Sequence, residues 1–284
     1  MSIIAKIVRR FNHKIVRPLV YDESLQYAYS TTSICGGILR GKTAVVTGAS
    51  SGIGYAISQR LLNEGCNVIL TGRNEYKLQA SVAKLYNLSL PRITYRVIDQ
   101  LDTHMIRAGI EEIFNAGNVD IWINCAGVLK QSDRQRQFRG VDSATYFEVV
   151  NTNLKSVIFT TDLVANKMMH QDVDGVILNV ASLCGFTNGF GYTPYGISKN
   201  GVIEYTKRVA DQFKEKISIF SVAPGAVATR MGEVGFGKNI AGGSSFTRHV
   251  GIPEEIAAEI VFLVGIAAKH LKGRTVLASA GEVL

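Results

Sequence analysis

The chain is poor in cysteine and has no apolar run long enough to cross a membrane. Its 284 residues include four cysteines, which stand far apart and form no C-x-x-C pair. This spacing argues against a zinc cluster or a disulfide framework and favours a reducing compartment. We expect each to be a small buried or half-buried side chain: Cys35, Cys66, Cys125 and Cys184. No stretch approaches 18 uninterrupted apolar residues, so the sequence predicts no membrane-spanning helix.

Acidic residues are missing from the first 21 positions, although the whole chain carries a net charge of +8. Five basic residues lie there: Lys6, Arg9, Arg10, Lys14 and Arg17. The rest of the sequence shows no basic stripe with interleaved aromatics, which argues against binding to nucleic acid.

The same N-terminal segment is amphipathic, because its apolar residues recur at helical spacing. These residues are Ile3, Ile4, Ile7, Val8, Phe11, Ile15 and Leu19. Three interpretations stay open: a helix on an anionic membrane surface, an arm packed on the protein's own body, or an organelle transit peptide. Low serine content weakens the third, mitochondrial, alternative. We expect a cytoplasmic protein, with peripheral membrane contact through residues 1–20 as one alternative.

From residue 41 onward, short apolar β-branched runs alternate with helical patterns. The predicted strands are 42–47, 67–71, 93–98, 119–125, 175–181, 217–223 and 275–279. Parallel strands need crossover helices, so this alternation predicts an α/β fold with one Rossmann-type, doubly wound parallel sheet of about seven strands flanked by helices. No linker interrupts it. We expect a basic amphipathic extension over 1–40 and a nucleotide-binding catalytic domain over 41–284.

The segment TGASSGIG (47–54) follows the first predicted strand and opens the first predicted helix. A dinucleotide pyrophosphate binds at such a turn, because backbone N–H groups and the positive helix end favour phosphate. At the end of the second strand an NAD site usually has an acid, whereas this chain has Gly72 and then Arg73. A guanidinium can pair with a 2′-phosphate, which favours NADP(H) over NAD(H). Alternatively, Arg73 is a solvated turn residue.

Tyr195 and Lys199, in TPYGISKN (193–200), stand four residues apart and would share one helix face. A neighbouring cation lowers the pKa of a phenol, so the pair suits proton transfer. With 11 tyrosines, chance alone supplies about half such a pair, and the pair becomes informative only beside other motifs.

Six motifs in order make the chain from about residue 39 onward resemble the short-chain dehydrogenase/reductase family, in its main single-domain branch. They are TGASSGIG, NCAG (124–127), NTNL with Asn153, ASLCG with Ser182, YGISK with Tyr195, and PGAVATRM (224–231). Ser182 precedes Tyr195 by 13 residues, the family's usual separation. The chain is most similar to 3-oxoacyl carrier-protein reductase-like carbonyl reductases. It departs from the pattern at Ala181, at Cys125 and in its last residues, ASAGEVL.

The resemblance implies a catalytic tetrad of Asn153, Ser182, Tyr195 and Lys199. Tyr195 would donate a proton to a carbonyl oxygen as NADPH delivers hydride, and Ser182 would hold that oxygen. Lys199 would bind the nicotinamide ribose and lower the pKa of the tyrosine, while Asn153 would bend its helix and anchor a relaying water. No metal is required, and none of the five histidines stands at ligand or triad spacing.

The resemblance also implies a set of cofactor contacts. Besides Tyr195 and Lys199 they are Gly48, Ser50, Ser51, Gly52, Ile53, Gly54, Arg73, Asn74, Asp99, Asn124, Ala126, Gly127, Pro224, Gly225, Val227 and Thr229. Asp99 either contacts the adenine or caps the next helix.

The predicted reaction is NADPH-dependent reduction of a ketone, such as a 3-oxoacyl compound, to a secondary alcohol. The loops 128–142 and 230–250 would select the substrate, and the basic stretch 130–140 is either a dock for a phosphate-bearing carrier or a solvated loop. Family resemblance implies a homodimer or homotetramer. The alternative function is a non-catalytic NADP-binding scaffold or redox sensor, although such proteins often lose the tyrosine or lysine that this chain keeps.

Overall fold

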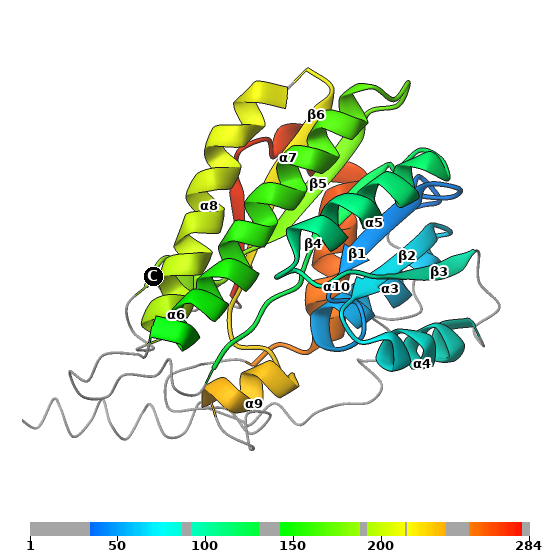
Figure 1. Cartoon of the computed structure of the whole chain (residues 1–284). Coiled ribbons are helices and arrows are strands. Elements are labelled where there is room, and N and C mark those ends of the chain that lie inside the picture. Colours follow the sequence, from blue (N-terminus) through cyan, green and yellow to red (C-terminus); the bar gives the residue numbers. More distant parts are fainter. Residues whose placement is uncertain are drawn as a thin grey trace, which may run out of the picture.

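The computed structural model describes residues 35–86, 92–130, 143–187, 192–213, 215–236 and 250–279. In these segments the chain forms a seven-stranded parallel sheet with helices on both faces (Figure 1). The predicted fold class is confirmed.

The strands follow the order β3-β2-β1-β4-β5-β6-β7. They are β1 (Thr43–Thr47), β2 (Asn67–Gly72), β3 (Ile93–Val97), β4 (Ile121–Asn124), β5 (Gly175–Val180), β6 (Ile217–Pro224) and β7 (Thr275–Ala278). The chain order reverses between β1 and β4, so the loops leaving these strands diverge and open a crevice at their carboxyl ends.

Alternating side chains of the strands bury two separate cores. Val46 of β1 faces α3 (Gly52–Asn63), α4 (Glu75–Tyr86) and α10 (Pro253–Phe262), whereas its neighbour Val45 faces the opposite helices. Those helices are α5 (Thr103–Asn115), α7 (Ser156–Met169) and α8 (Thr193–Phe213), which lie in front of the sheet in Figure 1. Burial on both faces explains why the strands are continuous apolar runs.

Two shorter helices lie toward the carboxyl ends of the strands. α6 (Ser143–Val150) runs through a π-helical turn (Asn151–Lys155) into α7, and α9 (Arg230–Phe236) crosses below the strand ends (Figure 1). After α10 come a second π-helical turn (Leu263–Ala267) and a 3₁₀ turn (Ala268–His270), and another 3₁₀ turn (Leu183–Gly185) lies between β5 and α8. None of the described helices has the length and apolar character of a membrane span.

The strand β4 is shorter than the predicted 119–125, because side chains take over the backbone partners at its two ends. Val119 exchanges hydrogen bonds with the amide of Gln171, at 2.8 and 3.0 Å. At the other end the hydroxyl of Thr47 accepts from the backbone nitrogens of Cys125 and Ala126, at 2.9 and 3.0 Å. These bonds hold the NCAG segment against the end of β1.

The described end of the N-terminal extension packs into the main core. Cys35 and Leu39 are each 1% exposed and lie against the turn at Gly265, and the Cys35 backbone nitrogen donates to the side chain of Glu64, just after α3, at 3.2 Å. The predicted amphipathic segment over residues 1–20 lies outside the described residues. The four cysteines are reduced, with Cys35 and Cys66 buried and the other two half-buried, as predicted.

Candidate active site

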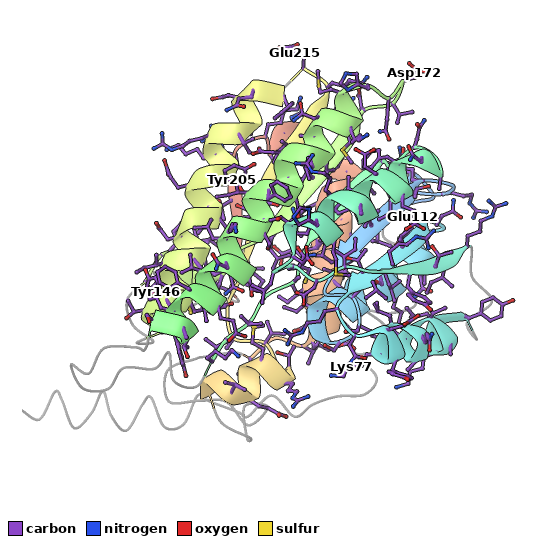
Figure 2. The ribbon with its side chains drawn as sticks, viewed as in Figure 1. Lys77, Glu112, Tyr146, Asp172, Tyr205 and Glu215 are labelled. Carbon is purple, nitrogen blue, oxygen red and sulfur yellow. The ribbon has the colours of Figure 1, made fainter. Side chains whose placement is uncertain are left out.

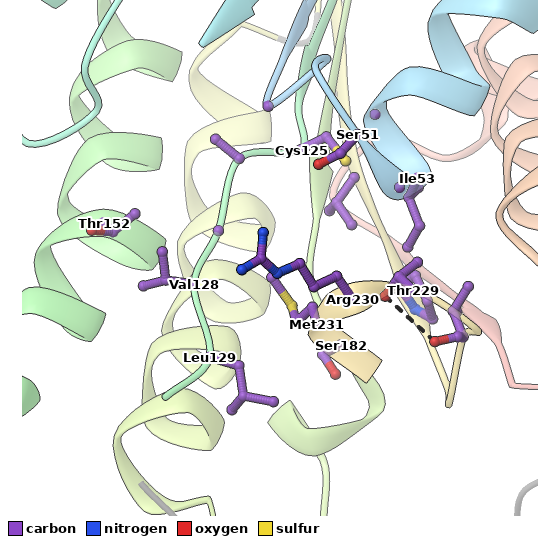
Figure 3. Close-up of a pocket in the computed structure, with 18 of the residues that line it drawn as sticks. Ser51, Ile53, Cys125, Val128, Leu129, Thr152, Ser182, Thr229, Arg230 and Met231 are labelled. Atoms are coloured by element: carbon purple, nitrogen blue, oxygen red, sulfur yellow. Dashed lines mark hydrogen bonds between the residues drawn. The ribbon is translucent and has the colours of Figure 1, made fainter. Parts of the chain in front are cut away.

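A cavity of about 380 Å³ opens at the carboxyl ends of the strands, within the usual size of ligand pockets (Figure 3). The loops that follow β1, β2, β3, β4, β5 and β6 all contribute to its wall. Every residue predicted to touch cofactor or substrate lines this cavity, except Asn124 and Asn153.

The turn between β1 and α3 has a backbone that only glycine accommodates. Gly48 has a φ of 67°, and a Cβ added there would lie 2.8 Å from the Cα of Ala126. A Cβ on Gly54 would lie 2.5 Å from the carbonyl oxygen of Gly48. The turn therefore packs closely and points the first amide groups of the 12-residue α3 at the cavity, which fits a dinucleotide pyrophosphate.

At the β2–β3 side the cavity wall is basic. Arg73 follows β2 with no acid in front of it, and the exposed Lys77 lies one turn into α4, on the same side of the molecule as α9 (Figure 2). The Asn74 side chain accepts from the Lys77 backbone nitrogen at 2.9 Å and so caps α4. Lys77 was missed from the sequence; its position four residues after Arg73 was the available signal.

Asp99 lines the cavity and does not cap the next helix. Its carboxylate accepts from the backbone nitrogen of Leu101 at 3.0 Å, whereas Asp102 caps α5 by accepting from His104 and Met105. The capping alternative for Asp99 is therefore wrong.

Tyr195 and Lys199 share one face of α8, as their spacing predicts. The Nζ of Lys199 lies 5.8 Å from the centroid of the Tyr195 ring and donates to the carbonyl of Val180, at the end of β5, at 2.8 Å. Both side chains line the cavity yet are nearly enclosed, at 8% and 4% exposed. Ser182 begins the turn after β5 and its hydroxyl accepts from the backbone of Cys184 at 3.2 Å.

Burial governs the proton affinities of this pair. Desolvation raises the pKa of Tyr195, the thiol of Cys184 adds to this, and a hydrogen bond with Ser182 works against it. Desolvation also lowers the pKa of Lys199 to about 8. The sequence predicted that Lys199 lowers the pKa of the phenol; in this structure burial raises that pKa, and Lys199 is not among the groups that shift it.

Asn153 lies one layer behind the cavity, in the π-helical turn before α7. Its side chain accepts from the Val128 backbone nitrogen at 2.8 Å and donates to the Val128 carbonyl at 2.9 Å and to the Ser198 hydroxyl at 3.2 Å. These bonds tie the segment after β4 to α8. The π-helical turn is the local distortion predicted for Asn153; its part in a proton relay stays a prediction.

The prediction that the Asn124 side chain contacts the cofactor is wrong, because this side chain does not reach the cavity. Its amide donates to Asn179 at 2.8 Å and to Thr161 at 3.1 Å, and its carbonyl accepts from Trp122 at 3.0 Å. This polar network is buried between β4, β5 and α7. The chain direction at the end of β4 sends Asn124 inward and presents Cys125, Ala126 and Gly127 to the cavity.

The sequence analysis predicted the substrate side of the cavity only as the loops 128–142 and 230–250, without naming its residues, and did not include Tyr192. An apolar wall of Leu129, Tyr192 and Met231 packs against Tyr195, and Arg230 projects beside it (Figure 3). The Tyr192 hydroxyl donates to the carbonyl of Gly235, which fastens α9 to the segment before α8. These contacts join segments far apart in sequence.

Histidines and metal ligands play no visible part in this site. His104, His170 and His270 are exposed and none lines the cavity, while His13 and His249 lie outside the described residues. In the described part of the chain no three His, Cys, Asp or Glu side chains are grouped to hold a metal ion.

Comparison with known proteins identifies the class. A model of the short chain dehydrogenase family matches residues 42–236. The chain is 32% identical over 255 residues to 3beta-hydroxysteroid dehydrogenase 2 of Eggerthella lenta, covering 86% of this chain and 95% of that protein. It is 31% identical over 255 residues to a 3-oxoacyl-acyl-carrier-protein reductase of Haemophilus influenzae, covering 87% and 100%.

Solved structures agree. A short chain dehydrogenase from Burkholderia cenocepacia, crystallised in complex with NADP, superposes with a TM-score of 0.76 at 27% identity and covers 86% of this chain and 98% of that one. The chain therefore belongs to the short-chain dehydrogenase/reductase family, whose members are oxidoreductases acting on alcohol and carbonyl groups.

Proposed function

We propose that this protein reduces a ketone to a secondary alcohol with NADPH, in a catalytic domain over 41–284. The observation that carries the proposal is the enclosed pair of Tyr195 and Lys199, which lines the same cavity as the glycine turn at Gly48. A phenol and an ammonium at one end and a phosphate-binding turn at the other suit proton transfer beside a bound dinucleotide.

The cofactor, when bound, supplies the hydride. The phenol of Tyr195 donates a proton to the carbonyl oxygen of the substrate, and the hydroxyl of Ser182 holds that oxygen in place. The high pKa of Tyr195 keeps it protonated at neutral pH. Lys199 binds the ribose hydroxyls, and its charge favours the transient phenolate. Asn153 positions the segment after β4 and connects it to α8.

The cofactor is NADP(H) in preference to NAD(H) under this proposal. Arg73 and Lys77 place two cations at the end of β2 and the start of α4, and no acid stands at the end of β2 to bind a ribose 2′-hydroxyl. Two cations suit a 2′-phosphate. The Burkholderia structure with NADP supports a nicotinamide cofactor, without deciding the preference.

For the substrate we propose a ketone, with a 3-oxoacyl thioester as one form. The names of the relatives point to a reductase of 3-oxoacyl chains and a dehydrogenase of steroid alcohols. The basic loop that could meet a carrier, beyond Lys130, lies outside the described residues, as do residues 237–249. Assembly as a homodimer or homotetramer and a cytoplasmic location belong to the same proposal. A non-catalytic NADP-binding scaffold is the alternative.

Tyr195→Phe tests the proposal on a panel of ketones with NADPH. The variant should lose at least a hundredfold in kcat and keep NADPH affinity, because general acids contribute about 10²- to 10⁴-fold while the ring preserves packing. Tyr205→Phe, further along the same helix, is a matched loss of a phenol hydroxyl that does not line the cavity. A Tyr195→Phe enzyme near wild-type rate would refute the acid role, and a wild type inert to every ketone would favour the scaffold.

A further inference from the structure

Arg230 reaches the catalytic end of the cavity from the wall opposite α8. Its neighbour Thr229 lies over the glycine turn, with its methyl group 3.4 Å from where a Cβ on Gly52 would be. Its other neighbour, Met231, packs in the cluster that contains Tyr195. Arg230 therefore stands between the phosphate-binding turn and the proton donor, and Figure 3 shows its side chain extending from α9 into the cavity.

The backbone that carries Arg230 is held at two places. The hydroxyl of Thr229 accepts from the Gly232 nitrogen at 3.0 Å, and the Thr229 carbonyl accepts from the Glu233 nitrogen at 2.8 Å. At the far end of α9, Tyr192 donates to the carbonyl of Gly235. These bonds hold the backbone of α9 beside the cavity, and the exposed side chain of Arg230 lines that cavity.

Charge around Arg230 is unbalanced. Among the described residues it forms no ion pair, and Glu233, one turn along α9, is exposed and does not line the cavity. Asp99 is the only acid in the described cavity wall, and it follows β3, five strands away from β6, or about 24 Å at the usual strand spacing. Two other acids, Asp172 and Glu215, lie at the opposite end of the molecule (Figure 2).

The cavity wall near Arg230 is largely apolar, since Leu129, Tyr192 and Met231 pack in one cluster with Tyr195 and line the same cavity. Lys199 is the other cation at this end. A cation beside an apolar wall, without an ion pair among the described residues, is complementary to a molecule that is apolar around its carbonyl and ends in an anionic oxygen group. Arginine binds carboxylates and phosphates through two parallel hydrogen bonds.

We propose that Arg230 binds an anionic group of the ketone substrate, so that the enzyme selects keto acids or phosphorylated ketones over neutral ketones of the same shape. This inference rests on the proposed function, and it makes Arg230 a specificity-determining residue. The expected selectivity is about 10- to 100-fold in kcat/KM, the range of a charge-assisted bond pair partly exposed to water.

The experiment compares linear keto acids, from levulinate upward, with their methyl esters, and dihydroxyacetone phosphate with dihydroxyacetone. Wild type should prefer the charged member of the fitting pair, and Arg230→Gln should bring that ratio close to one. Arg208→Gln, which removes an arginine that is 74% exposed on α8 and paired with Glu204, is the control for net charge and should keep the ratio. The keto acid pairs test for binding of a carboxylate, and the dihydroxyacetone phosphate pair tests for binding of a phosphate.

Two results would overturn the inference. One is an acid-to-ester ratio near one in the wild type for every pair. The other is an Arg230→Gln variant in which KM for NADPH rises while the ratio is retained, which would assign Arg230 to a cofactor phosphate. A binding titration separates this inference from the proposed reaction. The same ligands are titrated into NADPH-saturated Tyr195→Phe, with and without Arg230→Gln. If no ketone is turned over, the proposed reaction fails, but the binding data still show whether selectivity for anions depends on Arg230.

Discussion

At the scale of single residues, the buried ammonium group of Lys199 is unfavourable for folding. Lys199 is almost fully enclosed, and burial lowers its pKa from 10.5 to about 8. At neutral pH it is still protonated in the folded chain, so folding must remove a charge from water in return for a hydrogen bond to the carbonyl of Val180. A residue kept at such a cost is typical of a functional site.

This predicts a pH-dependent stability. Between pH 8 and 10.5 the unfolded chain holds a proton on Lys199 that the folded chain has lost, so the free energy of unfolding rises with pH in this window. At high pH the shifted pKa of Lys199 contributes about 3 kcal/mol to the free energy of unfolding, and this contribution is lost as the pH falls through 8. Below pH 8, Lys199→Met should therefore be more stable than wild type, with the difference shrinking toward pH 10.5.

Chemical unfolding of both proteins at several pH values measures this difference. Lys207→Met, an exposed lysine on the same helix, is the control and should give a difference that does not change with pH. A Lys199→Met curve parallel to that of the wild type throughout would show that the lysine is not desolvated as the structure places it.

At the scale of elements, the residues at the end of β2 should set the preference between NADPH and NADH. Gly72 leaves room for a side chain, because an added Cβ would meet only Leu78, at an ordinary 3.6 Å. Gly72→Asp with Arg73→Ala should therefore fold and turn the preference from NADPH toward NADH, since the new carboxylate repels phosphate and accepts bonds from the ribose. Both Arg73 and Lys77 are exposed, so the wild-type preference should be about tenfold, at the lower end for charge-assisted bonds.

The measurement is kcat/KM with each cofactor at low salt, where exposed ion pairs are least screened. Lys77→Ala should weaken the use of NADPH and leave that of NADH unchanged. Equal use of both cofactors by the wild type would rule out the assignment.

The segment before β1 belongs to the folded body at least from Cys35. Leu39 is 1% exposed while the adjacent Ile38 is 57% exposed, so the two form a matched pair for substitution. Leu39→Ala should lower the free energy of unfolding by about 2–5 kcal/mol, because it leaves a cavity against the turn at Gly265. Ile38→Ala should change it by less than about 0.5 kcal/mol. Thermal or urea unfolding checks both, and similar effects of the two would mean that this segment is not packed as described.

At the scale of the whole molecule, the basic N-terminal segment is a helix on an anionic membrane surface, an arm packed on the folded domain or a transit peptide, and the membrane alternative makes the following prediction. Deleting residues 1–20 removes five basic side chains and an apolar stripe but no described contact. The deletion should keep reductase activity, and only the full-length chain should sediment with vesicles rich in anionic lipid, less so at high salt. Equal sedimentation of the two would favour a packed arm, as would a loss of stability on deletion.

Much of the fold could be predicted from sequence because its signals are local. Both faces of the sheet are covered, so each strand is a short apolar run, and the glycine turn must lie between the first strand and its helix. The tyrosine and lysine are four residues apart, and α8 alone places them side by side. The strand limits were less certain, since the ends of β4 depend on Gln171 and Thr47, which no local pattern connects to it.

The sheet, the glycine turn at its first strand and the pairing of Tyr195 with Lys199 could therefore be predicted from sequence alone, because all of them follow from neighbours within a few residues. Tertiary structure decided what depends on distant segments. It turned Asn124 into a buried network with Asn179, enclosed Lys199 enough to shift its pKa, and brought Arg230 of α9 to the cavity that holds Tyr195. The burial of a side chain and the charge around it depend on all the residues packed against it, and only the folded chain brings those residues together.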